Sequence, residues 1–110
     1  LDTDEIVGSP AWMAPEQLRG AAPAPSADIW SFCALAHSVL NGRPLYSGTA
    51  DAVFEARRTG VGPQPDFSML ADRHLAEALA AGFAPPADRP SARELAAALA
   101  RAGFGAPPAR

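Results

Sequence analysis

Apolar residues recur at helical spacing along residues 27–40, and this is the strongest helix signal in the chain. They stand at positions i, i+3, i+4, i+7, i+10 and i+11, and they are Ile29, Phe32, Cys33, Ala36, Val39 and Leu40. Further apolar residues occupy most of the remaining circumference, so we expect this helix to be buried within a larger body. Ser26 is expected to cap its N-terminus, and Asn41 followed by Gly42 is expected to end it.

Shorter helices are expected on both sides of this central helix. Their predicted ranges are 14–19, 50–58, 69–81 and 92–102. Thr49 is expected to cap the second of them, and Ser91 with Glu94 forms a capping-box pattern before the last. Proline- and glycine-rich connectors separate the helices, and no segment alternates as a half-buried strand would. The sequence therefore predicts a mostly helical fold, a bundle around the buried central helix.

The composition indicates that the core of this bundle is thin. Of the 110 residues, 26 are Ala and 12 are Pro, while large apolar side chains are few. An alanine side chain removes little apolar area from water when it is buried, so it contributes little to stability. We therefore expect the chain on its own to be marginally stable.

The charged residues exclude several classes of function. All nine basic residues are Arg and none is Lys, so lysine chemistry on a carbonyl or a nucleotide phosphate is excluded. The net charge is −3 and the arginines are scattered, which argues against a nucleic acid or a membrane surface as partner. No apolar run reaches the roughly 20 residues that cross a bilayer.

The single cysteine and the two histidines add little chemistry. Cys33 alone excludes an internal disulfide and fits a reducing compartment, so we expect a cytoplasmic protein. His37 and His74 have no second ligand at metal spacing, so no metal site is expected and each is interpreted as a structural histidine with satisfied hydrogen bonds.

Three motifs carry a family resemblance. Residues 8–16 read Gly-Ser-Pro-Ala-Trp-Met-Ala-Pro-Glu, residues 28–32 read Asp-Ile-Trp-Ser-Phe, and residues 89–91 read Arg-Pro-Ser. In this order and at these separations, the chain resembles the C-terminal half of the large lobe of a protein kinase domain, over residues 3–101. The Gly-Ser-Pro string favours the serine/threonine kinases over the tyrosine kinases.

The resemblance implies a division of the chain and a role for each motif. Residues 1–16 would be the rest of the activation loop, the substrate-facing loop and the Ala-Pro-Glu motif, 17–102 a helical scaffold, and 103–110 a flexible tail. The substrate-facing residues would be Gly8, Ser9, Pro10 and Trp12. Thr3 stands where an activation-loop phosphosite would fall, although acidic neighbours already surround it.

The resemblance also implies structural partners for three charged residues. Glu16, after Ala14 and Pro15, would form an ion pair with Arg89, 73 residues away. Asp28 would accept hydrogen bonds from the backbone of the catalytic loop, or, as the simpler alternative, would interact with the helix dipole. Cys33 stands where the family commonly has Gly, so slightly wider packing is expected around it.

The motifs that perform phosphoryl transfer are missing from this sequence. It contains no Gly-rich phosphate loop, no catalytic His-Arg-Asp and no metal-binding Asp-Phe-Gly. No cofactor is expected in this stretch, and ATP and Mg2+ are implied only for a complete kinase. The expected partners are a protein substrate and the missing N-terminal part of the domain. We therefore expect a part of a serine/threonine kinase that is inactive alone, or else a catalytically inactive kinase-like regulatory or interaction module.

Overall fold

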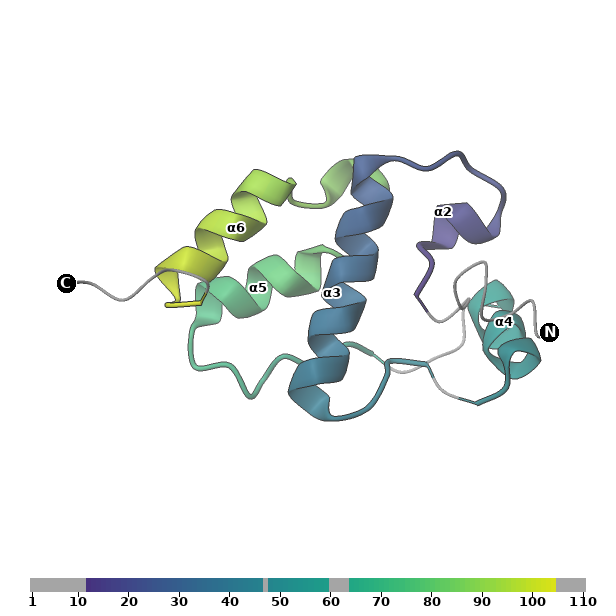
Figure 1. Ribbon diagram of the computed structural model, residues 1–110, viewed down its shortest axis with the longest axis horizontal. Helices are drawn as coiled ribbons and strands as arrows, with labels where there is room; N and C mark the ends of the chain where they lie inside the picture. Colours follow the sequence, from purple (N-terminus) through teal and green to yellow (C-terminus); the bar gives the residue numbers. More distant parts are fainter. Residues whose placement is uncertain (1–11, 47, 60–63, 105–110) are drawn as a thin grey trace.

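The computed structural model describes residues 12–46, 48–59 and 64–104 of the chain. Its elements follow in the order α2 (Pro15–Leu18), α3 (Pro25–Asn41), α4 (Ala50–Thr59), α5 (Arg73–Ala81), the 3-10 helix η1 (Pro86–Asp88) and α6 (Ala92–Arg101). The described residues contain helices and no strand, which confirms the predicted mostly helical fold. Figure 1 shows α3 in the middle, with α5 and α6 on one side and α2 and α4 on the other.

Helix α3 begins earlier than its sequence pattern predicts. Ala24 is the N-cap, with an extended backbone, and Pro25 takes the first helical position, where its missing N–H costs nothing. The expectation that Ser26 caps the helix is therefore wrong, because this residue already lies in the first turn. The predicted end is confirmed: Gly42 has a φ of 73°, a left-handed conformation that glycine adopts without strain.

The caps of the shorter helices are set by local side chains. The hydroxyl of Thr49 accepts the N–H of Ala52 at 3.1 Å, and Ser91 and Glu94 form the predicted reciprocal capping box. Helix α5 was expected to begin at Met69, and this is wrong by four residues. Asp72 caps the helix by accepting the N–H of Leu75 at 2.9 Å, so the residues before it stay outside the helix.

Helix α3 packs on two sides against two separate apolar clusters. The larger cluster joins α3 to α5, α6 and the connector before α5, through Ile29, Cys33, Phe67, Leu75, Ala76, Leu79, Leu95 and Ala98. The smaller one joins α3 to the residue before α2, through Ala14, Ala27, Trp30 and Ala34. Trp30 and Phe83 meet edge to face with their ring centroids 5.3 Å apart, and Phe83 packs against both clusters.

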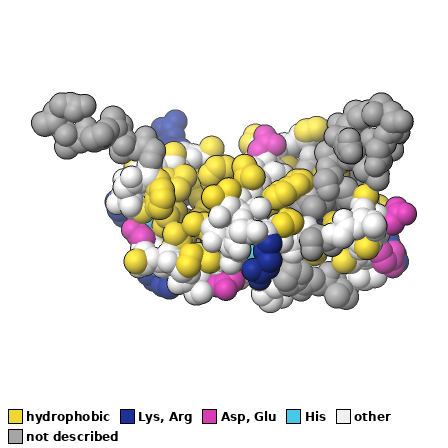
Figure 2. Space-filling model, turned by 60° about the horizontal axis from the view of Figure 1, so that its bottom comes forward, with side chains coloured by type: hydrophobic (Ala, Val, Ile, Leu, Met, Phe, Trp, Pro, Cys, Tyr) yellow, Lys and Arg dark blue, Asp and Glu magenta, His cyan; other side chains and the backbone are white. Residues whose placement is uncertain are grey.

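The third side of α3 is exposed, which differs from the expectation of a helix buried on all sides. Phe32, Leu35 and Val39 are 42 %, 52 % and 74 % exposed, although each is a large apolar residue. Figure 2 shows one face of the molecule, on which hydrophobic side chains gather in the middle. Within the described residues, the apolar surface of α3 thus exceeds what the other helices cover.

A glycine accommodates Cys33 in the core. Cys33 is fully buried, and a Cβ atom added to Gly82 would overlap its sulfur. The space for Cys33 comes from the missing side chain of Gly82 at the end of α5. The expected wider packing around Cys33 stays a prediction. None of the described helices is both long and apolar enough to cross a membrane.

Candidate functional site

The Ala-Pro-Glu motif forms the beginning of helix α2. Pro15 takes the first helical position, and the side-chain oxygen of Gln17 accepts the N–H of Ala14 at 3.0 Å. Ala14 is fully buried, whereas no residue of α2 itself is buried. The apolar residues of the helix itself, Pro15 and Leu18, are therefore only partly buried.

Arg89 supplies a polar attachment for α2. Its side chain is only 1 % exposed, although it carries a full positive charge. Its Nη1 and Nη2 donate to the two carboxylate oxygens of Glu16 at 2.7 and 2.9 Å. Its Nη1 also donates to the carbonyl of Ser26 at 2.9 Å, and its Nε to that of Ala84 at 2.8 Å. The predicted ion pair is thus present, with the two-pronged geometry that a guanidinium makes with a carboxylate.

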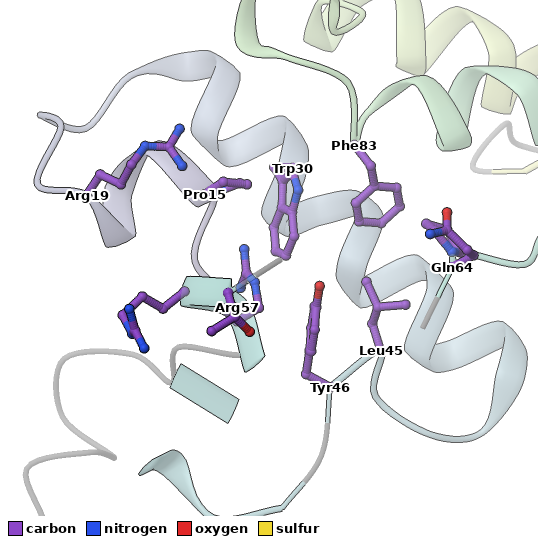
Figure 3. Close-up of a pocket in the computed structure, with 11 residues that line it drawn as sticks. Pro15, Arg19, Trp30, Leu45, Tyr46, Arg57, Gln64 and Phe83 are labelled. Carbon is purple, nitrogen blue, oxygen red and sulfur yellow. The ribbon is translucent and has the colours of Figure 1, made fainter. Parts of the chain in front are cut away.

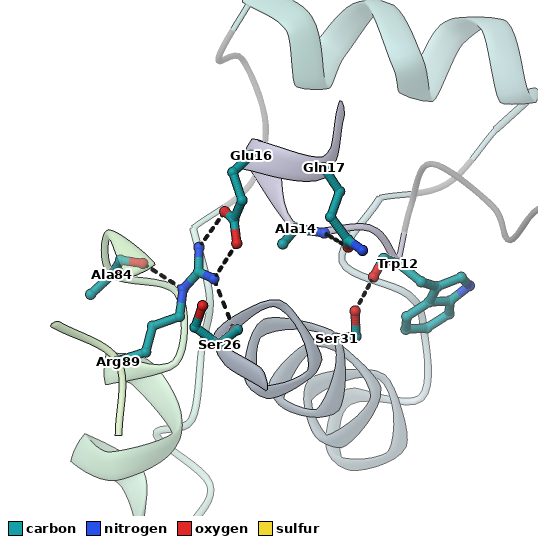
Figure 4. Close-up of polar contacts among 8 residues, drawn as sticks. All are labelled: Trp12, Ala14, Glu16, Gln17, Ser26, Ser31, Ala84 and Arg89. Atoms are coloured by element: carbon teal, nitrogen blue, oxygen red, sulfur yellow. Dashed lines mark hydrogen bonds and ion pairs between the residues drawn. The ribbon is translucent and has the colours of Figure 1, made fainter. Parts of the chain in front are cut away.

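The electrostatics of the pair follow from this geometry. The hydrogen bonds from Arg89 lower the pKa of Glu16, and partial burial opposes that effect. The Glu16 side chain is 18 % exposed, so the pair lies at the edge of the core. Figure 4 shows how Arg89 connects three segments: α2, the first turn of α3, and the connector after α5. The pair therefore fixes the position of the Ala-Pro-Glu motif.

Trp12 is the described residue of the predicted substrate-facing loop. Its carbonyl accepts a hydrogen bond from the hydroxyl of Ser31 on α3, and its ring packs against the smaller cluster (Figure 4). The other predicted residues of that loop, Gly8, Ser9 and Pro10, lie outside the described residues, as does the possible phosphosite Thr3. Of the predicted substrate-facing loop, the structure therefore describes the C-terminal end.

Asp28 lies in the first turn of α3 with an exposed side chain. Among the described residues its carboxylate makes no hydrogen bond. Its negative charge in the first turn of α3 interacts favourably with the helix dipole. It lines an apolar cavity of about 300 Å³ together with Phe32 and Leu99. Its predicted partner, a catalytic loop, is not part of this sequence.

His37 was interpreted as a histidine with satisfied hydrogen bonds, and this is wrong within the described part of the chain. It is 3 % exposed, and neither ring nitrogen has a hydrogen-bond partner there. The ring meets Phe67 edge to face at 5.4 Å. Its pKa is lowered, first by burial and then by the positive charge of Arg43. Both effects favour the neutral imidazole.

An arginine-lined pocket is the feature that the sequence did not predict. Arg57 of α4 lies over the rings of Trp30 and Tyr46, with its guanidinium carbon 4.3 and 4.8 Å from their centroids. These residues line a cavity of about 460 Å³, to which Arg19 and Arg58 also contribute (Figure 3). The sequence signal would have been the adjacent pair Arg57-Arg58, which alone looks like an ordinary basic end of a helix.

Known proteins similar to this chain are serine/threonine protein kinases. The kinase PknK of Mycobacterium bovis is 37 % identical over 95 residues, which are 81 % of this chain and 8 % of that protein. PkaA of Streptomyces coelicolor is 33 % identical over 104 residues, or 88 % of this chain and 18 % of that protein. Ppk11 of Schizosaccharomyces pombe is 44 % identical over 45 residues, or 41 % of this chain and 14 % of that protein. No protein-family model matches the chain.

The chain thus spans less than a fifth of the length of these relatives. The similarity to the two bacterial kinases nevertheless covers most of the chain itself. In addition, Glu16 and Arg89, which belong to two of the three kinase-like motifs, meet in the structure. By sequence similarity, and with a helical structure compatible with part of the large lobe, the chain belongs to the serine/threonine protein kinase family.

Proposed function

We propose that this chain is the substrate-facing and scaffolding part of an active serine/threonine kinase. The whole protein would transfer the γ-phosphate of ATP, with Mg2+, to Ser or Thr of a protein substrate. The residues that perform the transfer are not in this sequence, so the role of the described residues is to hold the substrate-facing loop in place. A cytoplasmic location goes with this proposal, since one cysteine cannot form an internal disulfide.

The observation that carries this proposal is the pair between Glu16 and Arg89. A loop that receives a protein substrate needs a fixed anchor, because a small displacement of a reacting group lowers the rate strongly. Here the buried guanidinium ties α2 to α3 and to the connector after α5 by four hydrogen bonds. Trp12, two residues before the motif, is held to α3 by Ser31. The C-terminal end of the substrate-facing loop is therefore held in a fixed position.

The proposal is tested with the protein made from the complete reading frame that contains this sequence. Transfer of labelled phosphate from ATP to a serine-containing protein is measured for the wild type, for Arg89→Met and for the matched control Arg73→Met, whose arginine is exposed on α5. We expect phosphorylation by the wild type and the control, and a loss of tenfold or more for Arg89→Met. A complete protein that binds ATP but transfers no phosphate would contradict the proposal.

A catalytically inactive interaction module is the alternative function. The observation that favours it is the exposed apolar side of α3, because large exposed apolar patches commonly mark interaction sites. The same experiment separates the two functions, since the inactive module would show no phosphate transfer. A reading frame without the Gly-rich loop and the catalytic Asp would also favour the module.

A further inference from the structure

The connector before α5, residues 64–72, is attached to the core by few apolar side chains. It runs past the C-terminal end of α3 to the start of α5 (Figure 1). Phe67 is its one buried residue, with 5 % of its surface exposed, and Leu70 is partly buried. The ring of Phe67 meets that of His37 edge to face at 5.4 Å and stacks on that of Phe83 at 6.3 Å. The place of the connector therefore depends on the contact between Phe67 and His37.

The surroundings of His37 suit only an uncharged imidazole. The residue is 3 % exposed, and across the described part of the chain neither of its ring nitrogens has a hydrogen-bond partner. A protonated imidazole has two N–H donors and a full positive charge, and a buried charge needs partners or water. Protonation of His37 therefore costs more free energy in the packed arrangement than in water.

The charged groups around His37 lie on two segments. Burial lowers the pKa of His37 most, the positive charge of Arg43 just after α3 lowers it further, and the negative charge of Asp66 raises it. Asp66 belongs to the connector, is exposed, and accepts the N–H of Ser68 with its carboxylate and the side-chain amide of Asn41 with its carbonyl. The ionisable residues of α5 are all exposed: Arg73, His74 and Glu77. The charge that favours protonation is thus carried by the connector itself.

We propose that protonation of His37 releases the connector from α3, so that the contact between His37 and Phe67 acts as a pH-sensitive switch. In the released arrangement water reaches the imidazolium, and Phe67 leaves the larger cluster and its contact with Phe83. The other members of that cluster keep α3 packed against α5 and α6, so the opening is local. Release of the connector involves no phosphoryl transfer, and it is therefore tested independently of the proposed kinase function.

The direction and size of the pH effect follow from the linkage of protonation to opening. The pKa of His37 is lowered in the packed arrangement, and in the released one it returns to the ordinary value of 6.5. Above pH 6.5 both arrangements are neutral and the connector stays packed. Below pH 6.5 the released arrangement takes up a proton, and its population rises by up to about tenfold per pH unit until the pH reaches the lowered pKa.

The test measures amide hydrogen exchange by mass spectrometry at pH 7.5, 6.5 and 5.5, on the protein made from the complete reading frame. Each rate is divided by the rate of an unstructured peptide at the same pH, so that only the opening of the structure is compared. The reporting peptide covers the connector, in which the N–H groups of Ser68 and Leu70 are hydrogen-bonded. A peptide covering residues 95–101 of α6 reports on global unfolding.

Three variants separate the switch from a general effect of pH. His37→Leu cannot be charged. Arg43→Gln removes a positive charge that opposes protonation, and its arginine is exposed, so the core is kept. His74→Gln is the matched control, because His74 is the other histidine of this sequence and is exposed on α5.

We expect the corrected exchange of the connector to rise about three- to tenfold from pH 7.5 to 5.5 in the wild type and in His74→Gln. The rise should be absent in His37→Leu and smaller in Arg43→Gln, whose His37 has a pKa closer to 6.5. At pH 5.5 the wild-type connector should open at least about tenfold more often than α6.

An unchanged corrected exchange of the wild-type connector between pH 7.5 and 5.5 would overturn the proposal. The same rise in His37→Leu as in the wild type would overturn it too, because another group would then be titrating. Equal opening of the connector and α6 at pH 5.5 would show global unfolding in place of local release. If His37→Leu does not fold, Arg43→Gln decides, and a rise as large as that of the wild type counts against the switch.

Discussion

Replacing Arg89 by methionine should destabilise the protein more than the replacement of any other arginine that the structure describes. The change keeps a similar side-chain length but removes all four hydrogen bonds of the guanidinium. Breaking a buried ion pair on one side costs about 3–5 kcal/mol, and here the carbonyls of Ser26 and Ala84 lose their donor together with the carboxylate of Glu16. A chain of 110 residues has a total stability of about 5–15 kcal/mol, so this one change removes a large share of it.

A variant of Glu16 measures how much the negative charge of this residue contributes to the free energy of unfolding. Glu16→Gln keeps the shape of the side chain and one acceptor oxygen, while it removes the negative charge that faces Arg89. We expect a loss of about 1.5–3 kcal/mol, the range for hydrogen bonds to charged groups. In a double-mutant cycle with Arg89→Met, the two losses should not add, and the coupling should amount to about 1–3 kcal/mol.

Urea unfolding followed by circular dichroism measures these losses. With a slope of about 1–3 kcal/mol per molar urea, a loss of 3 kcal/mol moves the midpoint by at least about 1 M. The pH dependence gives an independent check. The pKa of Glu16 is lowered in the folded state, so its contribution is fully present above the unfolded pKa of 4.5 and is lost as the pH falls through the folded value. Glu16→Gln should therefore reduce the acid sensitivity.

Either of two results would refute the prediction for Arg89, and an exposed arginine serves as the control. Arg73→Met, at an exposed position of α5, is the control and should change the stability by less than about 0.5 kcal/mol. If Arg89→Met costs less than about 1 kcal/mol, or if its effect simply adds to that of Glu16→Gln, the pair does not hold α2 in place.

Further predictions concern the core and the helix ends. Gly82→Ala should cost about 1–3 kcal/mol through overpacking against Cys33, and the added change Cys33→Gly should recover part of that loss in urea unfolding. The pKa of His37 is lowered below its unfolded value of 6.5, so the stability should fall as the pH drops below 6.5 and the unfolded state takes up the proton. His37→Leu should reduce this loss between pH 7.5 and 5.5, and an unchanged pH profile would contradict the burial argument. Ser91→Ala should cost about 1 kcal/mol by removing the capping box with Glu94, whereas Ser91→Asp should restore most of it.

The helices were predictable where their ends are set by neighbouring residues. The capping box of Ser91 and the glycine at position 42 are local signals, and both appear as expected. The start of α5 was predicted too early, because the apolar residues before Asp72 were included in the helix. Asp72 accepts a hydrogen bond from the N–H of Leu75 and so becomes the N-cap, and the helix begins after it. The first turn of α3 was missed in the same way, since Pro25 is as suitable for a first turn as for a connector.

The candidate site is formed by contacts between residues that are far apart in the sequence, and no local sequence pattern predicts such contacts. The pairing of Glu16 with Arg89 was expected only from the family resemblance, because two residues so far apart share no helix or turn. The arginine-lined pocket was not expected at all, since Arg19 and Arg57 look like ordinary surface charges in the sequence. Only the packing of α4 against Trp30 brings the guanidinium of Arg57 over an aromatic ring.

The thin core explains why these polar contacts matter for the position of the site. Among the residues that the structure describes, five of the 14 buried apolar ones are alanines, which contribute little buried area: Ala14, Ala27, Ala34, Ala76 and Ala98. Apolar contacts between small side chains also leave the orientation of a short helix poorly defined, because they have no preferred direction. Helix α2 has no buried residue, so the directional bonds of Arg89 to Glu16 determine its orientation relative to α3. A lysine at position 89 would keep the charge but not the two parallel bonds, and the motif would then lose its fixed direction although the ion pair remained.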